Sequence, residues 1–154
     1  MSEKVEVLIS AMYQTDLALF EKTGVTTDGL IINQCNENAV QKQEECGRQY
    51  KMISTMERGL SRSRNLALEN AQGDYCLLCD DDELLYEDYE EKIVDAYKKY
   101  PDADIICFKV ILEEKVYSNK PYKIGYLKAL RVSSVQISMK LDSIKKAGIL
   151  FDEE

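Results

Sequence analysis

The sequence predicts an α/β protein, a three-layer α/β/α sandwich with a mainly parallel central sheet. Two observations lead to this fold class. Short apolar runs typical of buried strands alternate along the chain with stretches of helical periodicity, a pattern typical of parallel sheets covered by helices on both faces. The chain has 154 residues, of which 45% are hydrophobic, so it is long enough to bury one sizeable core. We therefore expect a single domain over residues 1–154.

The first third of the chain contains three candidate strands. Residues 5–11 (VEVLISA) and residues 29–34 (GLIINQ) are short and apolar, and a helix starting at about Thr15 separates them. Residues 36–49 are polar and contain early asparagines, so we interpret them as a loop or a poorly packed helix. The third strand is expected at residues 50–54.

The central segment, residues 59–86, has the clearest order of elements. A helix is expected from its N-cap Ser61 to Gln72, and Gly73 fits the left-handed residue that commonly follows a helix. The apolar residues 75–79 (YCLLC) then predict a buried strand. In an open α/β sheet, ligands bind beyond the carboxyl ends of the strands. The acidic residues that follow this strand are therefore expected at the site position.

The last third continues the alternation. Tyr89, Ile93 and Tyr97 recur at helical spacing and predict a helix that packs on the core and ends before Pro101. After it we expect a strand at 104–112, a surface crossing at 115–128, a strand at 130–139, and a short helix at 141–147 that is closed by Gly148.

Three adjacent aspartates, Asp80, Asp81 and Asp82, follow the central strand. Neighbouring carboxylates repel one another, so a cation is expected to offset them. In extended backbone, Asp80 and Asp82 point the same way and form a D-x-D pair of oxygen ligands suited to Mg²⁺ or Mn²⁺. The alternative is a solvated acidic loop in which one aspartate caps the next helix, and the run of charge alone leaves both interpretations open.

The composition excludes several classes of function. A net charge of −8 and an isoelectric point near 4.7 argue against a nucleic-acid partner. An anionic substrate would need local help, which the arginines Arg58, Arg62 and Arg64 beside the predicted site are placed to give. The chain contains no histidine, so Ser-His-Asp and Cys-His catalysis and histidine metal ligation are excluded. Carboxylates therefore remain as the candidate catalytic and metal-binding groups.

The cysteines and glycines exclude further classes. Cys76 and Cys79 spell C-x-x-C, but residues three apart in a strand point to opposite faces, so we interpret them as buried small hydrophobes. Without a secretory signal, the five cysteines favour a reducing cytoplasm. No glycine pair forms G-x-G, and Leu30 and Ile31 stand where a P-loop needs Lys and Ser or Thr. No apolar run approaches the roughly 20 residues of a membrane span, so any association with the inner face of the membrane is expected to be peripheral or through a part missing from this sequence.

The central segment resembles the central motif of the family 2 glycosyltransferases of the GT-A fold, a Rossmann-like architecture. The matching residues are Gly59, Ser61, Arg64, Asn65, Ala67, Ala71, Gly73 and Asp74, followed by the apolar strand and the aspartates. VEVLISAMYQ near the start is similar to the family's first strand and the Tyr-Asn pair after it, with Tyr13 as the tyrosine and Gln14 in place of the asparagine. IKKAGILFDE near the end is similar to the family's helix and Gly-Gly-Phe-Asp-Glu segment.

The resemblance implies an inverting transferase of polysaccharide biosynthesis that moves a sugar from a nucleotide-sugar, with a UDP-sugar favoured, to a glycan or other acceptor. It places Ala11 and Tyr13 against the base and Arg64 against the diphosphate. Asp80 and Asp81 are assigned to the nucleotide, and Asp80 and Asp82 to Mn²⁺ or Mg²⁺. Family members usually carry an aspartate at the end of the second strand, where this chain has Asn33 and Gln34, so the base contact expected there differs from the family's.

In this family the general base lies shortly after the Phe-Asp-Glu segment, so we expect it beyond Glu154 and interpret the chain as the donor-binding part of a longer enzyme. Two other functions stay open. One is a catalytically incomplete module that binds a nucleotide-sugar. The other is a nucleotidyltransferase, which would usually show a glycine-rich basic loop after its first strand, unlike residues 11–16.

Overall fold

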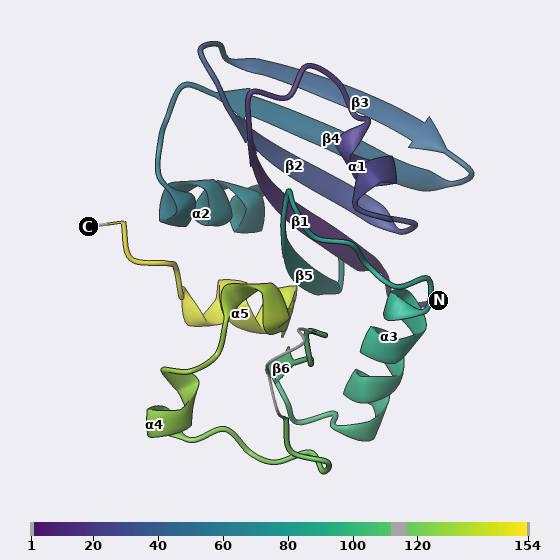
Figure 1. Cartoon of the computed structure of the whole chain (residues 1–154), viewed down its shortest axis with the longest axis vertical. Helices are drawn as coiled ribbons and strands as arrows, with labels where there is room; N and C mark the ends of the chain where they lie inside the picture. The colour runs from purple at the N-terminus through teal and green to yellow at the C-terminus, as the bar shows by residue number, and fades with distance from the viewer. Residues whose placement is uncertain (1, 112–116, 154) are drawn as a thin grey trace.

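The computed structural model describes residues 2–111 and 117–153, which form one seven-stranded sheet with helices on both faces (Figure 1). In chain order, the strands are β1 (Val5–Met12), β2 (Asp28–Gln34), β3 (Ala39–Glu45), β4 (Arg48–Thr55), β5 (Tyr75–Asp80), β6 (Ile105–Cys107) and β7 (Ile137–Lys140). The helices are α1 (Leu19–Lys22), α2 (Leu60–Asn70), α3 (Tyr89–Lys99), α4 (Tyr126–Ala129) and α5 (Leu141–Ala147), with a 3₁₀ turn, η1 (Ser134–Gln136), before β7.

The sheet has the order β3-β4-β2-β1-β5-β7-β6. Its four central strands, β4, β2, β1 and β5, are parallel, whereas β3 and β7 run antiparallel to their neighbours. This arrangement confirms the predicted Rossmann-like α/β/α sandwich. The sheet is mixed, because three of its six strand pairings are parallel and three are antiparallel.

Each face of the sheet has its own apolar core. Residues of α1 and α3 pack on one face and residues of α2 and α5 on the other, which gives the three layers visible in Figure 1. Cys79 belongs to the first core and Cys76 to the second, as the strand alternation predicted. Burial raises the pKa of both thiols, which keeps them protonated and unreactive. Within the described residues, no helix has both the length and the apolar character of a bilayer span.

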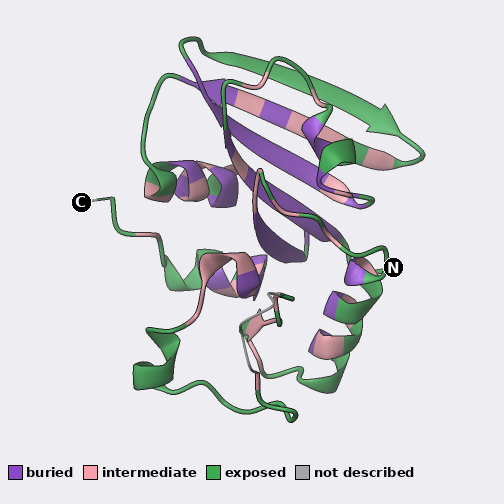
Figure 2. Ribbon diagram, viewed as in Figure 1, coloured by how far each residue is buried: buried purple, intermediate pink, exposed green. Residues whose placement is uncertain are grey.

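The interpretation of residues 36–49 as a loop or helix is wrong, because β3 and the start of β4 form a hairpin there. Every residue of β3 is exposed, so the strand has no apolar face whose alternation would reveal it (Figure 2). Cys46 and Gly47 connect the strands with φ of 51° and 76°, the positive values that a tight two-residue hairpin turn requires.

Three other boundaries differ from the predictions. The first helix begins at Leu19, not near Thr15, since the Asp16 carboxylate accepts the Ala18 N–H at 2.9 Å and holds a turn there. The strand expected at 104–112 covers only Ile105–Cys107, and Leu112 lies outside the described residues. The stretch 130–139 is turn and η1 up to Ile137, where β7 begins. Of the surface crossing expected at 115–128, residues 115–116 lie outside the described residues, and its end overlaps α4.

The two residues predicted to end α2, Ser61 as N-cap and Gly73 as a left-handed residue, have other roles. Its N-cap is Gly59, with φ 111°, and Ser61 lies inside the helix. Gly73 has no positive φ and is required for space, because a Cβ there would lie 2.7 Å from the Cβ of Glu6. The Glu6 carboxylate accepts the N–H groups of Gln72 and Gly73 at 2.6 and 2.7 Å, which fixes the turn between α2 and β5.

Substitution of Gly73 by alanine should lower the free energy of unfolding by about 1–3 kcal/mol, because the new methyl group must displace Glu6 from β1. Urea unfolding of both proteins measures the difference. Gly125→Ala is the matched control, since a Cβ there meets no atom of the described residues within 4 Å. If Gly73→Ala and Gly125→Ala have the same free energy of unfolding, the turn between α2 and β5 can accept a methyl group and the steric argument is wrong.

Candidate functional site

The carboxyl ends of β1, β2, β4 and β5 meet at one edge of the sheet, because these strands are parallel neighbours. At this edge lie Tyr13, which follows β1, Gln34 at the end of β2, and Asp80 at the end of β5. The start of α2 also faces this edge, since the Gln34 amide donates to the carbonyl oxygen of Gly59 at 2.9 Å. The structure therefore brings most of the predicted site residues to the carboxyl edge of the parallel strands, here called the crevice.

Arg64 projects from α2 to the end of β5 and is held on three sides. Its Nη2 atom donates to Ser134 Oγ at 2.7 Å and lies 3.5 Å from Asp80 Oδ1, and its guanidinium group lies 5.6 Å from the centre of the Phe151 ring. Only 11% of the side chain is exposed. Arg64 is therefore a cation held in a fixed position, and a guanidinium group of this kind suits an anionic ligand, although Asp80 offsets part of its charge.

The three aspartates do not continue the strand. The Asp80 N–H donates to a carboxylate oxygen of Glu83 at 3.1 Å, and the Glu83 N–H approaches the Asp80 carbonyl oxygen at 3.4 Å, so the chain turns directly after β5. The extended geometry expected for Asp80 to Asp82 is therefore wrong. Asp81 is partly exposed and Asp82 is exposed. Burial of the Glu83 carboxyl group raises its pKa, and the nearby charges of Asp80 and Asp82 raise it further.

The carboxylates of this turn fit a divalent cation only in part. Among the described residues, no group of three or more acidic, cysteine or histidine side chains is close enough to form a complete metal site. Mg²⁺ in nucleotide sites usually takes one or two carboxylates and completes its shell with phosphate oxygens and water. Asp80 and Asp82, on a turn at the crevice, have the donor chemistry for that incomplete type of site.

Tyr13 directly follows β1 in a left-handed conformation, with φ 52° and 59% of its surface exposed. The guanidinium group of Arg58 lies 5.8 Å from the centre of its ring. Arg58 also donates to the Met56 carbonyl oxygen at 2.8 Å and to Asn36 Oδ1 at 3.0 Å, so it ties the loop before α2 to the end of β2. An exposed aromatic ring beside a fixed cation is suited to stacking with a planar ligand.

The remaining predicted base contacts are internal. Ala11 is buried in the core, and Asn33 is 1% exposed. The Asn33 amide accepts the Gln14 N–H at 2.8 Å and donates to the Gln14 carbonyl oxygen at 2.9 Å and to Ser54 Oγ at 3.0 Å. Asn33 therefore positions the segment after β1, and Gln34 positions the start of α2, as the contact with Gly59 shows.

Asn33→Asp is expected to destabilise the domain by about 2 kcal/mol or more, because a carboxylate would replace the buried donor and face the Gln14 carbonyl oxygen. Thermal and urea unfolding measure the loss. Asn36→Asp is the control, since Asn36 is exposed and its side-chain oxygen accepts a hydrogen bond from Arg58, which a carboxylate can also accept. If both variants unfold at the wild-type midpoint, Asn33 does not have the structural role assigned to it.

The central and terminal motifs of the sequence contact each other directly. The Asn65 amide donates to the Phe151 carbonyl oxygen at 2.9 Å and to Glu153 Oε1 at 2.8 Å, and it accepts the Phe151 N–H at 2.8 Å. Arg62 lies 3.5 Å from the Glu153 carboxylate. These contacts hold the end of the described chain along α2, as Figure 1 shows, and place the Phe151 ring against Arg64.

Sequence reasoning missed Ser134, Glu83 and the role of Arg58. Ser134 was hidden within a predicted strand that does not form there. Glu83 was detectable from the sequence, because it directly follows the aspartates as a fourth acidic residue. Arg58 was noted only as one of three basic residues, since no sequence pattern shows its contacts with Tyr13 and three successive backbone carbonyl groups.

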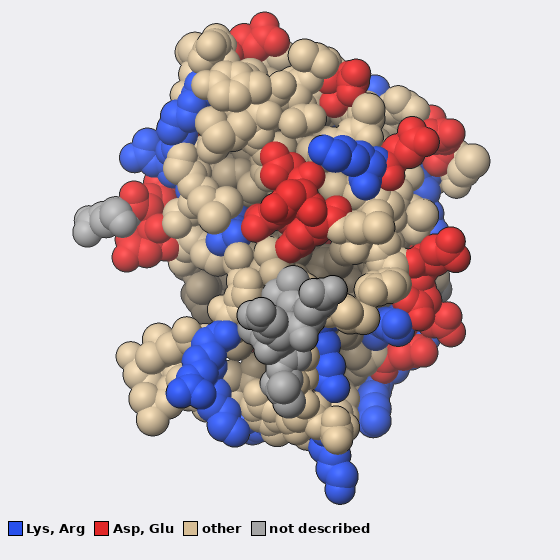
Figure 3. Space-filling model, in the orientation of Figure 1, with Lys and Arg blue, Asp and Glu red and all other residues tan. Residues whose placement is uncertain are grey.

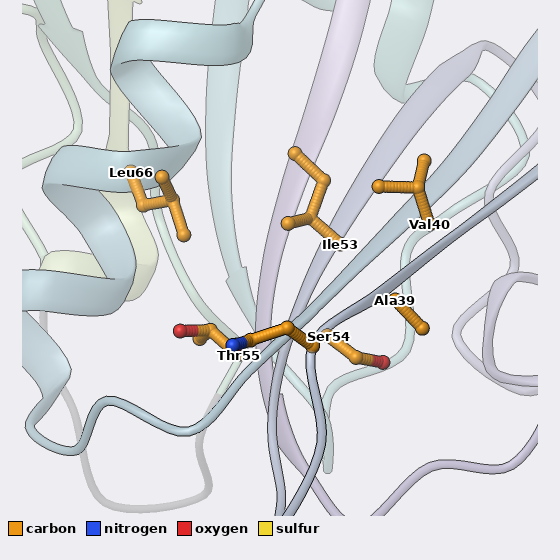
Figure 4. Close-up of a pocket in the computed structure, with 7 residues that line it drawn as sticks. Ala39, Val40, Ile53, Ser54, Thr55 and Leu66 are labelled. Carbon is orange, nitrogen blue, oxygen red and sulfur yellow. The ribbon is translucent and has the colours of Figure 1, made fainter.

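A separate apolar groove of about 420 Å³ lies between the β3–β4 hairpin and α2 (Figure 4). Its lining includes Val40, Ile53 and Leu66. The groove contains neither the arginine nor the aspartates of the crevice, so it is not the charged site described above.

Comparison with solved structures shows a similar fold. A crystal structure of S. aureus TarS residues 1–349 aligns with a TM-score of 0.67 and 15% identity over 98% of this chain and 51% of that one. The same TarS fragment in complex with UDP-GlcNAc aligns with a TM-score of 0.66 and 16% identity over 97% of this chain and 48% of that one. A longer TarS structure gives a TM-score of 0.69 at 14% identity, over 97% of this chain and 30% of that one.

The chain thus spans about half the length of the TarS fragments that it resembles. No curated protein matches it. The model of the glycosyl transferase family 2 matches residues 18–148, which include α2, the acidic turn and η1. On this evidence, the chain belongs to glycosyl transferase family 2.

Proposed function

We propose that this chain binds the nucleotide-sugar donor, with a UDP-sugar favoured, in a glycosyltransferase reaction. The observation that carries the proposal is the convergence of Arg64 from α2 and Asp80 from β5 at the carboxyl edge of the sheet, in a chain of this family. The complexes of TarS with UDP-GlcNAc and with UDP, in structures of the same fold, support the choice of nucleotide.

In this proposal, each group at the crevice acts on one part of the donor. The Arg64 guanidinium donates to the diphosphate and stabilises the negative charge that develops there as the sugar leaves. Ser134 and Phe151 keep it oriented before the donor arrives, so little reorganisation is needed. The exposed Tyr13 ring stacks on the base, while Asp80 and Asp81 approach the ribose.

We further propose that Asp80 and Asp82 hold Mn²⁺ or Mg²⁺ together with the diphosphate oxygens. When bound, the cation supplies Lewis-acid stabilisation of the leaving diphosphate. The carboxylates also need it for charge balance, because a diphosphate would otherwise enter beside the four acidic residues Asp80, Asp81, Asp82 and Glu83. From the family resemblance we also propose that the sugar passes, with inversion, to a glycan or other acceptor.

Isothermal titration calorimetry with UDP tests the proposal. We expect binding in Mn²⁺ that weakens strongly in chelator, with weaker binding of ADP under the same conditions. Equal affinity with and without Mn²⁺ would remove the metal from the proposal. If UDP fails to bind in either condition, the donor-binding function is wrong.

A further inference from the structure

Residues 117–131, here called the α4 segment, form an exposed surface that the proposed function does not use. Its helix, α4, contains no buried residue. Tyr126 is 85% exposed, Leu127 77% and Leu130 75%. Tyr122 and Ile124 of the same segment are also exposed. Contiguous exposed apolar side chains of this kind mark an interaction surface, whereas single ones are ordinary.

The charge of the α4 segment is opposite to that of the whole chain. It contains four basic residues and no aspartate or glutamate, although the chain carries a net charge of −8; the four are Lys120, Lys123, Lys128 and Arg131. Figure 3 shows basic side chains on the lower part of the molecule, where Figure 1 places α4, apart from the acidic cluster in the middle. A partner of this surface must therefore be both apolar and negatively charged.

The tyrosines add a third property. The Lys128 ammonium group lies 4.4 Å from the centre of the Tyr122 ring, so an aromatic ring and a cation occupy the same spot on the surface. Tyrosine rings and long basic side chains favour the boundary between water and lipid, where the apolar part is covered and the polar tip stays hydrated. A short helix rich in Tyr, Leu and Lys, without a buried face of its own, has the composition of an interfacial surface.

We propose that the α4 segment docks on a membrane surface that carries anionic phospholipids. The four basic residues provide the charge complementarity, and Tyr126, Leu127 and Leu130 enter the headgroup region. The same charges orient the molecule, because an anionic surface repels the rest of this acidic chain. The proposal is independent of donor binding.

Docking by this surface would bring the crevice close to the lipid. The α4 segment ends three residues before Ser134, whose hydroxyl group accepts the hydrogen bond from Arg64. The surface and the crevice are thus joined by a few residues of chain.

Sedimentation of the protein with vesicles tests the proposal. Vesicles of phosphatidylcholine with phosphatidylglycerol should bind at least about 100-fold more tightly than phosphatidylcholine alone, because several basic residues act together near the surface. High salt should weaken this binding. Equal binding to both vesicle types, or no binding to the anionic ones, would overturn the proposal.

Two paired variants locate the surface. Leu127→Ser with Leu130→Ser, and Lys123→Gln with Lys128→Gln, should each reduce anionic-vesicle binding about 10-fold or more. They should fold normally, because these side chains lie outside the core, and circular dichroism checks this. The matched controls are Leu84→Ser, at a leucine that is also 75% exposed, and Lys98→Gln with Lys99→Gln on α3; both should bind like wild type. If the control variants lose as much vesicle binding, the assignment to the α4 segment is wrong. It is also wrong if the paired variants bind vesicles like wild type but no longer associate with a second copy of the chain, because the surface would then be a contact between protein molecules.

Discussion

Replacement of Arg64 by methionine is expected to weaken UDP binding by about 100-fold, the largest single effect that the structure predicts. Loss of a buried, hydrogen-bonded charge at an interface costs about 2–5 kcal/mol, and about 1.4 kcal/mol corresponds to a factor of ten. The Arg64 side chain is only 11% exposed and is already oriented by Ser134, so its position cannot readily be filled by a neighbouring cation. Calorimetry in Mn²⁺ measures the change.

Arg62→Met is the matched control. Arg62 lies on the same helix, but its side chain is 50% exposed and contacts the Glu153 carboxylate at 3.5 Å. A surface ion pair of this kind contributes at most about 1 kcal/mol, so UDP binding should change by less than about fivefold. If the two variants lose affinity equally, UDP responds to general positive charge and not to a fixed contact with Arg64.

Asp82→Asn is expected to remove the metal-dependent part of UDP binding, so that affinity in Mn²⁺ falls to the value measured in chelator. The reason is that a neutral amide is a far poorer ligand for a hard cation than a carboxylate. The fold should not change, because the Asp82 side chain is exposed on the turn after β5 and has little packing to lose. Calorimetry and urea unfolding of the same sample separate the two effects.

Glu87→Gln is the control for Asp82, since it removes one negative charge from an exposed position in the same loop. It should bind UDP and Mn²⁺ like wild type. An Asp82→Asn protein that unfolds would favour the structural interpretation of the acidic run, in which an aspartate caps or closes the turn. An unchanged metal dependence would assign the cation to other ligands.

Arg64 and Asp80 lie close together, as expected, because of the strand order. They lie on consecutive elements: α2 begins just after the carboxyl end of β4, and the strand β5, which runs in the same direction as β4, ends at the same edge of the sheet. The apolar run 75–79 identified β5 because a strand buried on both faces has no polar residue to interrupt it. For these residues, local pattern and tertiary position agree.

The errors occur where local sequence carries little information about tertiary contacts. β3 is exposed on both faces and is held by backbone pairing with β4, so its polar sequence resembles a loop. Asn33 stands at a strand end where a ligand contact was expected, but its amide is satisfied by Gln14 and Ser54. Gly73 was predicted to adopt a left-handed conformation. A glycine is needed there because Glu6, 67 residues away in the chain, leaves no space for a side chain.

Nuclear magnetic resonance titration of the ¹⁵N-labelled chain with UDP and Mg²⁺ tests the central claim most directly. We expect the largest shifts at the amides of Tyr13, Gly59 and Asp80 to Asp82 and at the side chain of Arg64, with Gly125 and the groove at Val40 unaffected. Replacement of Mg²⁺ by paramagnetic Mn²⁺ should then broaden the signals of the acidic turn first. Shifts concentrated around Val40, Ile53 and Leu66, or the absence of shifts at Arg64 and Asp80, would contradict a donor site at the carboxyl edge of the sheet.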